Sequence, residues 1–365
     1  MSKRQQLLLN HNRTMKRSRL LPKKHLYLVL DDWDEGFSVH KIDLGTLQDT
    51  TTDLQVGFPE PAVLRLGAPE LSLTTLGSNI FIATNPRCGQ TPTLVYNTEK
   101  GGLTMGPRLP APLLGCFHIS VAAGDMLYGL SSYHLNVKQQ HSFEVLSPAP
   151  TGDKQQTWST KPSINWSWKS VPSPPPLDKD EIITSYALHP DGHTIVMSVH
   201  DRHALRLAKG THSYDTKHCE WRWHGEWVLP FQGQGFFDSD LDAWVGLHED
   251  GYICSCQVIS CSSASTMQPK WKMSKDKFFC SESDRHLGAT LTYMGDTRFC
   301  LVECVVDDEV EPECAFGDRN GCVLRLVTFG LKYSQKGELQ TKIHHTTSTL
   351  VSKHLVSFAP VAFWM

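Results

Sequence analysis

The sequence predicts an all-β fold, a β-propeller of about six blades. Two stretches of this 365-residue chain, 95–110 and 213–230, read almost alike. Each contains a short apolar strand, an Asn-Thr or Asp-Thr turn, a second apolar or aromatic strand, and a hydrophobic residue followed by proline. The 26 glycines and 21 prolines lie between short apolar runs, as frequent turns require. A repeated hairpin of this size indicates blades stacked around an axis.

Each predicted blade contains a pair of adjacent antiparallel strands. Apolar runs between these pairs, such as 116–121 and 182–188, are expected to be innermost strands that line a central channel. Residues 147–165 and 305–321 are expected to be extended loops. The six predicted strand pairs are 26–30 with 37–43, 77–83 with 93–96, 124–129 with 142–146, 193–198 with 211–214, 242–247 with 252–256, and 298–302 with 322–327.

Residues 26–365 are expected to form a single domain, preceded by a basic arm at 1–25. The C-terminal segment 356–365 is strongly apolar, and an exposed strand of that composition would aggregate. We therefore expect it to pair with the first blade, whose innermost strand is otherwise missing, and so to close the ring. The alternative is a pair of β-sandwiches divided in the proline-rich span 147–180, but the repeat resumes unchanged after that span.

The charge is distributed unevenly along the chain. The formal net charge is −3, but the first 25 residues contain eight basic residues and no acidic one, which leaves −11 for the remainder. An acidic body argues against binding of a nucleic-acid backbone. The arm has the spacing of a bipartite nuclear-localisation signal, which predicts a nuclear or cytoplasmic protein; a mitochondrial presequence and a solvated tail are the alternatives. The residues of this signal are Lys3, Arg4, Lys16, Arg17 and Arg19.

The cysteines and the hydropathy also predict an intracellular protein that does not bind membranes. Eleven cysteines, an odd number, without a signal peptide fit a reducing compartment. We expect buried or half-buried thiols; Cys254 and Cys256 lie two apart on a predicted strand and face the same side, where they could not easily pair. No apolar run reaches the roughly 18 residues that a membrane span needs.

The pattern of strand pairs resembles kelch-type propeller repeats, because Met105, Trp168 and Trp227 each precede a hydrophobic-Pro pair. More specifically, the chain resembles a family of uncharacterised grass proteins, expanded in rice and its relatives, that is known only as a domain of unknown function. That resemblance implies a kelch-like or galactose-oxidase-like propeller in a plant cell, and it implies no activity. It is carried by residues 24–33, 211–216, 225–231 and 241–247.

No catalytic, cofactor-binding or metal-binding residue is predicted. The 18 histidines do not occur in the spacings of zinc sites, and the nucleophile-elbow and phosphate-loop motifs are missing. Asp238, Asp240 and Asp242 could bind Ca²⁺ if their loop wrapped around the ion. We prefer an acidic turn between two strands, because the glycine and the distal glutamate of a calcium loop are not in register. His344 and His345 are expected to point to opposite faces of a strand.

Two groups of aromatic residues are expected to be structural. Trp221, Trp223 and Trp227 alternate along one strand and are expected to pack between blades rather than to bind a ligand. Trp33 is expected to cap the first hairpin. The alternative places four residues of that hairpin at the rim of the channel, namely Asp31, Asp32, Trp33 and His40.

The predicted function is that of a non-catalytic, monomeric scaffold that binds an unknown protein partner. The acidic run 307–313 is expected to be a solvated loop, with docking of a basic partner as the alternative. Because only roughly 25 residues precede the first predicted strand, we expect no F-box module. The alternative function is a small-ligand binder or an enzyme with a site in the central channel. Titratable residues that converge at one mouth would favour an enzyme, whereas an apolar or glycine-lined channel would favour the scaffold.

Overall fold

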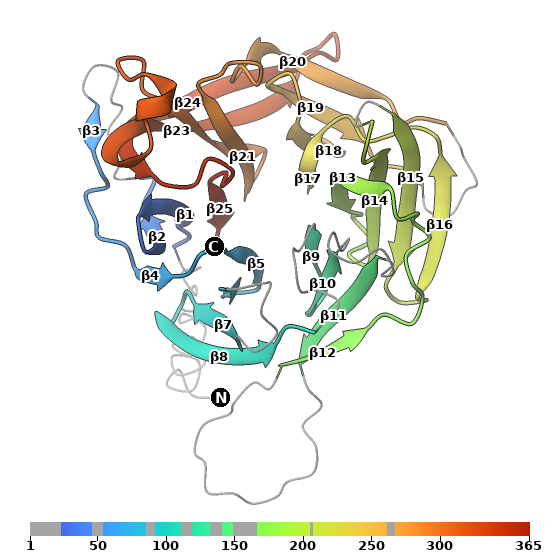
Figure 1. Ribbon diagram of the computed structural model, residues 1–365. Helices are drawn as coiled ribbons and strands as arrows, with labels where there is room; N and C mark the ends of the chain where they lie inside the picture. The colour runs from blue at the N-terminus through green and yellow to red at the C-terminus, as the bar shows by residue number, and fades with distance from the viewer. Residues whose placement is uncertain are drawn as a thin grey trace, which may run out of the picture.

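The computed structural model describes residues 23–45, 54–84, 92–110, 119–131, 141–148, 166–204, 207–260 and 267–365. In this part of the chain, antiparallel sheets surround a central axis (Figure 1), which is the architecture of a β-propeller. The prediction of an all-β fold is confirmed. The predicted localisation signal, and most of the loop expected at 147–165, lie outside the described residues.

The strands form four-stranded groups that run outward from the axis. In the first group the order is β25-β1-β2-β4, and every later group follows chain order, from β5–β8 to β21–β24. The first three groups contain β25 (Val361–Trp364), β1 (Leu26–Trp33), β2 (Gly36–Ile42) and β4 (Leu64–Gly67); β5 (Ser72–Leu76), β6 (Asn79–Ala83), β7 (Pro92–Asn97) and β8 (Gly102–Arg108); and β9 (Ile119–Ala123), β10 (Met126–Ser131), β11 (Ser142–Pro148) and β12 (Trp166–Ser170).

The remaining groups are joined into one larger sheet. They contain β13 (Glu181–Leu188), β14 (Thr194–Asp201), β15 (Ala208–Asp215) and β16 (Glu220–Gly225); β17 (Gln232–Asp238), β18 (Ala243–Leu247), β19 (Tyr252–Gln257) and β20 (Trp271–Lys277); and β21 (His286–Gly295), β22 (Arg298–Val306), β23 (Gly317–Tyr333) and β24 (Leu339–Lys353), with a 3-10 turn at Pro312–Cys314 and the short β3 (Gln55–Val56) beside β24.

Neighbouring groups pack through hydrophobic clusters, because successive side chains of a strand point to opposite faces. On β1, Leu26, Leu28 and Leu30 pack against β22 and β23, whereas Tyr27 and Val29 pack against β6 and β7. Further clusters join the second group to the third, the third to the fourth, the fourth to the fifth and the fifth to the sixth. The core is therefore a ring of separate clusters, each shared by two adjacent groups.

The strands of every predicted hairpin are paired, from β1 with β2 to β22 with β23. The predicted innermost strand 182–188 is β13, and the described part of 116–121 belongs to β9. The predicted loop 305–321 is shorter than expected, because Val305 and Val306 are buried and continue β22. The alternative of two β-sandwiches is wrong, since strands from both sides of 147–180 line one central cavity.

The C-terminal strand β25 pairs antiparallel with β1, beginning with Trp364 opposite Leu26. The pairing extends one residue further, where the backbone N–H of His25 donates to the carbonyl oxygen of Met365 over 2.7 Å and the reverse bond measures 3.1 Å. β25 thus occupies the innermost position of the first group.

A buried ion pair lies beside this junction. The Asp31 carboxylate on β1 accepts hydrogen bonds from the Lys353 ammonium at 3.0 and 3.3 Å and from the backbone N–H groups of His354 and Leu355 at 3.2 and 2.6 Å. The ammonium also donates to the Phe358 carbonyl. The side chains of Asp31 and Lys353 are only 5% and 2% exposed. The pair therefore fixes the connection between β24 and β25 against β1.

Two groups are also joined by backbone pairing at the axis. β13 and β17 are parallel neighbours, with Tyr186 opposite Gln234 and glycines at 233 and 235 on either side. The Phe231 ring lies 2.3 Å from the position that a Cβ at Gly235 would take, so a side chain there would displace the ring. β20 and β24 meet through a single parallel bridge, Ser274 with Leu339.

The cysteines differ in part from the prediction. Five of those described are buried, Cys219 is half-buried, and Cys280 and Cys314 are exposed. The two exposed residues lie in connections between strands, where no neighbouring sheet covers them. Burial raises the pKa of the Cys256 and Cys300 thiols to about 12, so these groups stay protonated. In the described part of the chain no helix is long and apolar enough to span a membrane.

Candidate functional site

A central cavity of about 660 Å³ is the candidate functional site. It is lined by residues of the innermost strands β5, β9, β13, β17, β21 and β25. No Asp, Glu, Lys or Arg is among the described residues of the lining, and its one histidine is His189. The uncharged polar residues of the wall include Thr75, Ser120, Gln232, Gln234 and Thr290.

The wall of this cavity is formed by strand edges. Consecutive residues line it, as in 120–122, 289–293 and 361–365. Because side chains alternate between the two faces of a strand, an uninterrupted run of lining residues shows that the backbone edge borders the cavity. Among the described strands, β5, β9, β21 and β25 each pair on one edge only. Their other edges direct backbone N–H and C=O groups toward the cavity.

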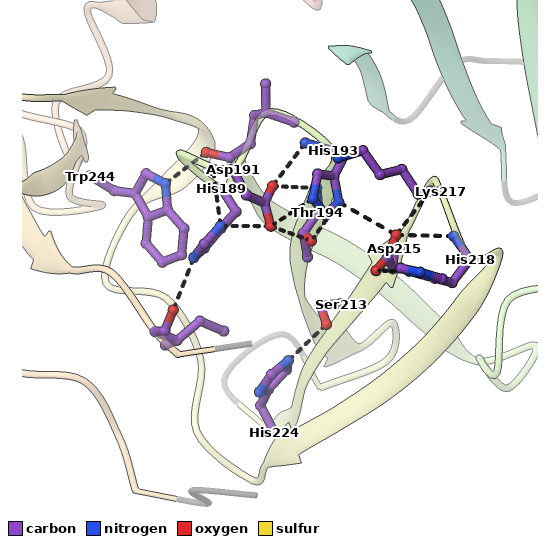
Figure 2. A network of polar contacts seen from close by, with 12 residues as sticks. His189, Asp191, His193, Thr194, Ser213, Asp215, Lys217, His218, His224 and Trp244 are labelled. Carbon is purple, nitrogen blue, oxygen red and sulfur yellow. Dashed lines mark hydrogen bonds and ion pairs between the residues drawn. The ribbon is translucent and has the colours of Figure 1, made fainter. Parts of the chain in front are cut away.

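A network of polar contacts begins at His189 on the wall of the cavity (Figure 2). In the turn between β13 and β14, Asp191 accepts hydrogen bonds from the backbone N–H groups of His193 and Thr194 at 2.8 Å each and from the Thr194 hydroxyl at 2.7 Å. Its carboxylate also lies 2.9 Å from Nδ1 of His189. Burial alone would raise the pKa of Asp191, but these donors outweigh it and lower the pKa.

The network continues to the turn between β15 and β16. Nδ1 of His193 lies 3.4 Å from the Asp215 carboxylate, which also pairs with Nδ1 of His218 at 2.7 Å. Burial opposes the charge on Asp215, but the hydrogen bonds from the His218 ring and from the backbone N–H groups of His218 and Lys217 lower its pKa to about 2. The same contact raises the pKa of His218. The two turns are therefore joined by a chain of alternating carboxylates and imidazoles.

The network positions these groups but leaves the imidazole at the cavity without a free nitrogen. His189 has Asp191 at Nδ1 and the Ile259 carbonyl 3.2 Å from Nε2. His193 has Asp215 at Nδ1 and Asp191 3.7 Å from Nε2. A general base must have a nitrogen that can reach the proton it removes. His189, the histidine at the cavity, is therefore engaged by the fold at both ring nitrogens.

The tyrosines of the wall are neutral at ordinary pH. Burial raises the pKa of Tyr186 to about 12. Burial and the hydrogen bond to Asp238 also raise the pKa of Tyr293 to about 12. The Tyr293 hydroxyl donates to the Asp238 carboxylate over 2.9 Å, and the backbone N–H of Thr297 donates to the same oxygen over 2.9 Å. Both phenols therefore offer hydrogen bonds or ring faces rather than charge.

The predicted acidic turn at Asp238, Asp240 and Asp242 is confirmed. Asp238 is buried and accepts hydrogen bonds from the N–H groups of Asp240 and Leu241 at 3.1 and 2.9 Å. Asp240 and Asp242 are exposed. The Asp238 carboxylate is used within the fold, since it also accepts the hydrogen bonds of Tyr293 and Thr297.

The residues at the first hairpin do not line the central cavity. Trp33 lies at the end of β1, where the Arg65 guanidinium sits 5.3 Å from its ring centre. Asp32 pairs with Nε2 of His40 at 3.3 Å, and Asp31 is held by Lys353. Trp33 lines a separate cavity of about 340 Å³ between the first hairpin and His354. The interpretation of Trp33 as a residue of the hairpin end agrees with this placement.

Of the three tryptophans expected to pack between blades, two do so and one does not. Trp221 packs into the cluster between the third and fourth groups, and Trp227 packs into the next cluster. Trp223 is 46% exposed, contrary to the prediction, and its ring lies 4.8 Å from that of His212. The ring covers Gly210, where a Cβ would lie 1.9 Å from it. β16 is an outer strand, so this face has no neighbouring sheet to cover it.

Acid is expected to destabilise the protein partly through His212. Burial, together with the nearby His224, lowers the pKa of His212 to about 4, below the unfolded value of about 6.5. The unfolded chain therefore binds the proton first, and this contribution to stability is present above pH 6.5 and is lost as the pH falls toward 4. In His212→Phe, the decrease in the free energy of unfolding between pH 7.5 and pH 5, measured by urea denaturation, should be smaller by about 1 kcal/mol.

His218→Asn is the matched control for this prediction. The folded protein raises the pKa of His218, so protonation of His218 stabilises the fold at low pH. Its replacement should make the loss on acidification larger. If both variants behaved like the wild type, titration of these histidines would contribute nothing to acid stability.

The sequence predicts that the runs 116–121 and 182–188 line the channel, and Ser120, Val121, Tyr186 and Leu188 do so. It does not predict the polar part of the wall that β17 contributes. Gln232 and Gln234 lie between glycines, in the segment Gln-Gly-Gln-Gly at 232–235. Four residues without an apolar side chain, directly before the apolar end of a strand, are unusual for a buried strand. The available signal was therefore the loss of apolar character in β17, and it required knowing that β17 lies at the axis.

Comparisons with known proteins give a family and a set of distant structures. A family model described as "Protein of unknown function (DUF1668)" matches residues 23–349. No curated protein matches the sequence. Among solved structures, the chain is similar to the periplasmic gluconolactonase PpgL of Pseudomonas aeruginosa, with 13% identity, a TM-score of 0.42, and 90% of this chain and 98% of that chain covered.

Two further structures show similar levels of likeness. A chain of a nidogen/laminin complex has 10% identity and a TM-score of 0.45, with 91% of this chain and 100% of that chain covered. The β-propeller domain of Cps50 (Swd1) from Myceliophteria thermophila has 9% identity and a TM-score of 0.34, with 74% of this chain and 70% of that chain covered. These values support no transfer of an activity, substrate or partner.

Proposed function

We propose a non-catalytic, protein-binding role for this chain, which belongs to the DUF1668 family of proteins of unknown function. In this proposal residues 26–365 form one kelch-like ring of six blades, closed by β25, that presents loops to an intracellular protein partner. The hydrophobic clusters between adjacent groups support a rigid frame. The histidine at the central cavity is engaged at both ring nitrogens, which supports binding rather than acid–base chemistry.

An acidic rim on one end of the ring carries the proposal. It lies on the connections β18–β19, β20–β21 and β22–β23, in which the only arginine or lysine is Arg285. The Ser281 hydroxyl donates to the Glu249 carbonyl over 2.6 Å, so the first two connections are in contact. The exposed acidic residues that define the rim are Glu249, Asp250, Glu282, Asp284, Asp308, Glu309, Glu311 and Glu313.

The fold holds the most acidic part of this rim in place. Arg285 donates from Nη1 to the backbone carbonyls of Asp307 and Val310, at 2.6 and 2.9 Å, rather than to a carboxylate. The N–H of Val310 donates to the Asp307 carbonyl over 3.0 Å. The loop is thus ordered by its backbone, and its carboxylates remain exposed. A preordered charged loop loses less conformational entropy on binding, and negative charge of this density favours a basic partner.

Removing the negative charges of the β22–β23 connection is expected to weaken binding of the protein partner. In Asp308→Asn/Glu309→Gln/Glu311→Gln/Glu313→Gln, loss of four rim charges should weaken binding about tenfold or more. The measurement is proximity labelling by the full chain in cells, with reproducible basic partners identified from the wild type. Binding of a purified partner should also weaken as the salt concentration rises.

The matched control neutralises four exposed acids at the other end of the strands. Glu99→Gln/Asp125→Asn/Asp240→Asn/Asp242→Asn has the same change in net charge, and these residues lie on the turns β7–β8, β9–β10 and β17–β18. The control should label the same partners as the wild type. Equal labelling by both variants would contradict the rim as the docking site. Absence of any reproducible partner, with a defined metabolite copurifying instead, would overturn the scaffold role.

A further inference from the structure

The central cavity offers unused hydrogen-bonding groups on several strands. Among the described residues, the side chains of Thr75, Ser120, Gln232, Gln234 and Thr290 make no hydrogen bond, whereas Thr292 donates to the Ala362 carbonyl. These groups come from β5, β9, β17 and β21, on different sides of the axis. The unpaired strand edges add backbone donors and acceptors. A ligand in the cavity can therefore be contacted by both kinds of group from several directions.

The electrostatics of the wall favour uncharged ligands over charged ones. A charged ligand loses its hydration when it enters a cavity, and an opposite charge or several hydrogen bonds aimed at the charged group must replace it. The lining contains no side chain of Asp, Glu, Lys or Arg, and both of its tyrosines have a raised pKa and stay neutral. His189, already paired with Asp191, is the remaining titratable side chain of the lining. The wall therefore suits an uncharged ligand.

The apolar part of the wall specifies the shape of that ligand. Aromatic residues of β17, β13, β21 and β25 are among those that line the cavity, and each also packs against a cluster between adjacent groups. They are Phe236, Tyr186, Tyr293 and Trp364. Aromatic rings pack best against flat or ring-shaped apolar surfaces. A volume of about 660 Å³ lies within the range of cavities that bury a drug-sized molecule.

We propose that the central cavity binds an uncharged, hydroxylated ring compound. Its hydroxyl groups bind the threonine, serine and glutamine side chains and the strand edges, and its ring faces pack on the aromatic residues. This binding is separate from the docking of a protein on the acidic rim. The two tests fail independently, because none of the rim residues lines the cavity.

Two commercially available probes that differ by one carboxylate test the ligand class. 4-Nitrophenyl β-D-glucopyranoside is uncharged, and 4-nitrophenyl β-D-glucuronide carries a negative charge on the same framework. Isothermal titration of the full chain should show saturable binding of the uncharged probe and at least about tenfold weaker binding of the charged one. Equal binding of both probes, or no saturable binding of the uncharged one, would overturn the proposal.

A pair of tryptophan substitutions tests the location. Gln234→Trp places a large ring in the cavity and should weaken binding of the uncharged probe at least about tenfold. Gln257→Trp makes the same change at an exposed residue of β19 that does not line the cavity, and it should bind as the wild type does. Unfolding temperatures without probe show whether both variants are folded. Unchanged binding by a folded Gln234→Trp would place the ligand elsewhere and refute the assignment of the cavity.

Discussion

Replacing Asp31 with alanine is expected to lower the free energy of unfolding by about 3–5 kcal/mol, because it leaves a buried ammonium without its counter-charge. The Lys353 side chain is 2% exposed and cannot reach water without moving the chain around it. The same substitution removes the acceptor of two backbone N–H groups, those of His354 and Leu355. Urea denaturation followed by tryptophan fluorescence measures the effect.

A double-mutant cycle distinguishes the charge from the packing. Asp31→Ala/Lys353→Met removes both charges and should recover part of the stability that Asp31→Ala loses. Asp34→Ala changes an exposed aspartate in the same hairpin and should alter stability by about 0.5 kcal/mol or less. If the double variant lost as much stability as Asp31→Ala and Lys353→Met lose together, an unpaired buried charge would not explain the instability of Asp31→Ala.

Trp244→Ala is expected to cost about 3–5 kcal/mol of the free energy of unfolding, in the range seen for large aromatic residues removed from a core. The side chain is completely buried in the cluster between the fourth and fifth groups, beside Trp227 and Phe231. Its Nε1 donates to the Leu188 carbonyl over 2.9 Å, at the end of β13. The substitution therefore leaves a cavity and an unpaired carbonyl at the junction of two blades.

Trp271→Ala provides the comparison for this prediction within the same four-stranded group. Trp271 lies on the outer strand β20, is 37% exposed, and stacks on His248 with ring centres 5.7 Å apart. Its loss should cost about 1 kcal/mol or less. Thermal or urea unfolding of the two variants at one pH makes the comparison. Similar losses would mean that the inter-blade clusters do not determine stability.

The hairpins could be predicted because their information is local. In Asp215-Thr216-Lys217-His218, the Asp215 carboxylate accepts from the N–H groups of Lys217 and His218 at 2.8 and 3.1 Å, which is the turn chemistry expected for aspartate. Asn97 does the same with the N–H of Lys100 at 2.9 Å. Alternation of side chains then assigns the two faces of each strand. Turns and strand pairs follow from these short-range rules.

The candidate site could not be predicted because it depends on contacts between distant segments. Thr75 and Thr290 border one cavity but are more than 200 positions apart, and neither has an unusual neighbour in the sequence. The His189–Asp191 turn illustrates the same limit. A second His-x-Asp-Gly turn occurs at His248–Gly251, where the backbone nitrogen of Asp250 lies 3.2 Å from Nδ1 of His248, the same distance as between Asp191 and His189. Only the first of the two borders the cavity.

The parallel pairing of β13 with β17 makes the contacts between innermost strands unequal around the axis. Between β13 and β17, backbone hydrogen bonds add to the packing of side chains. Among the described strands, β5, β9, β21 and β25 have no backbone pairing with the innermost strand of the adjacent group, so only side chains hold them to it. Thermal fluctuations should therefore separate the innermost strands β25, β5 and β9 from one another before they separate β13 from β17. Amide hydrogen exchange should then be slow in 185–187 and faster on the unpaired edges of β25, β5 and β9. A molecule that enters the cavity between two groups should pass between these strands.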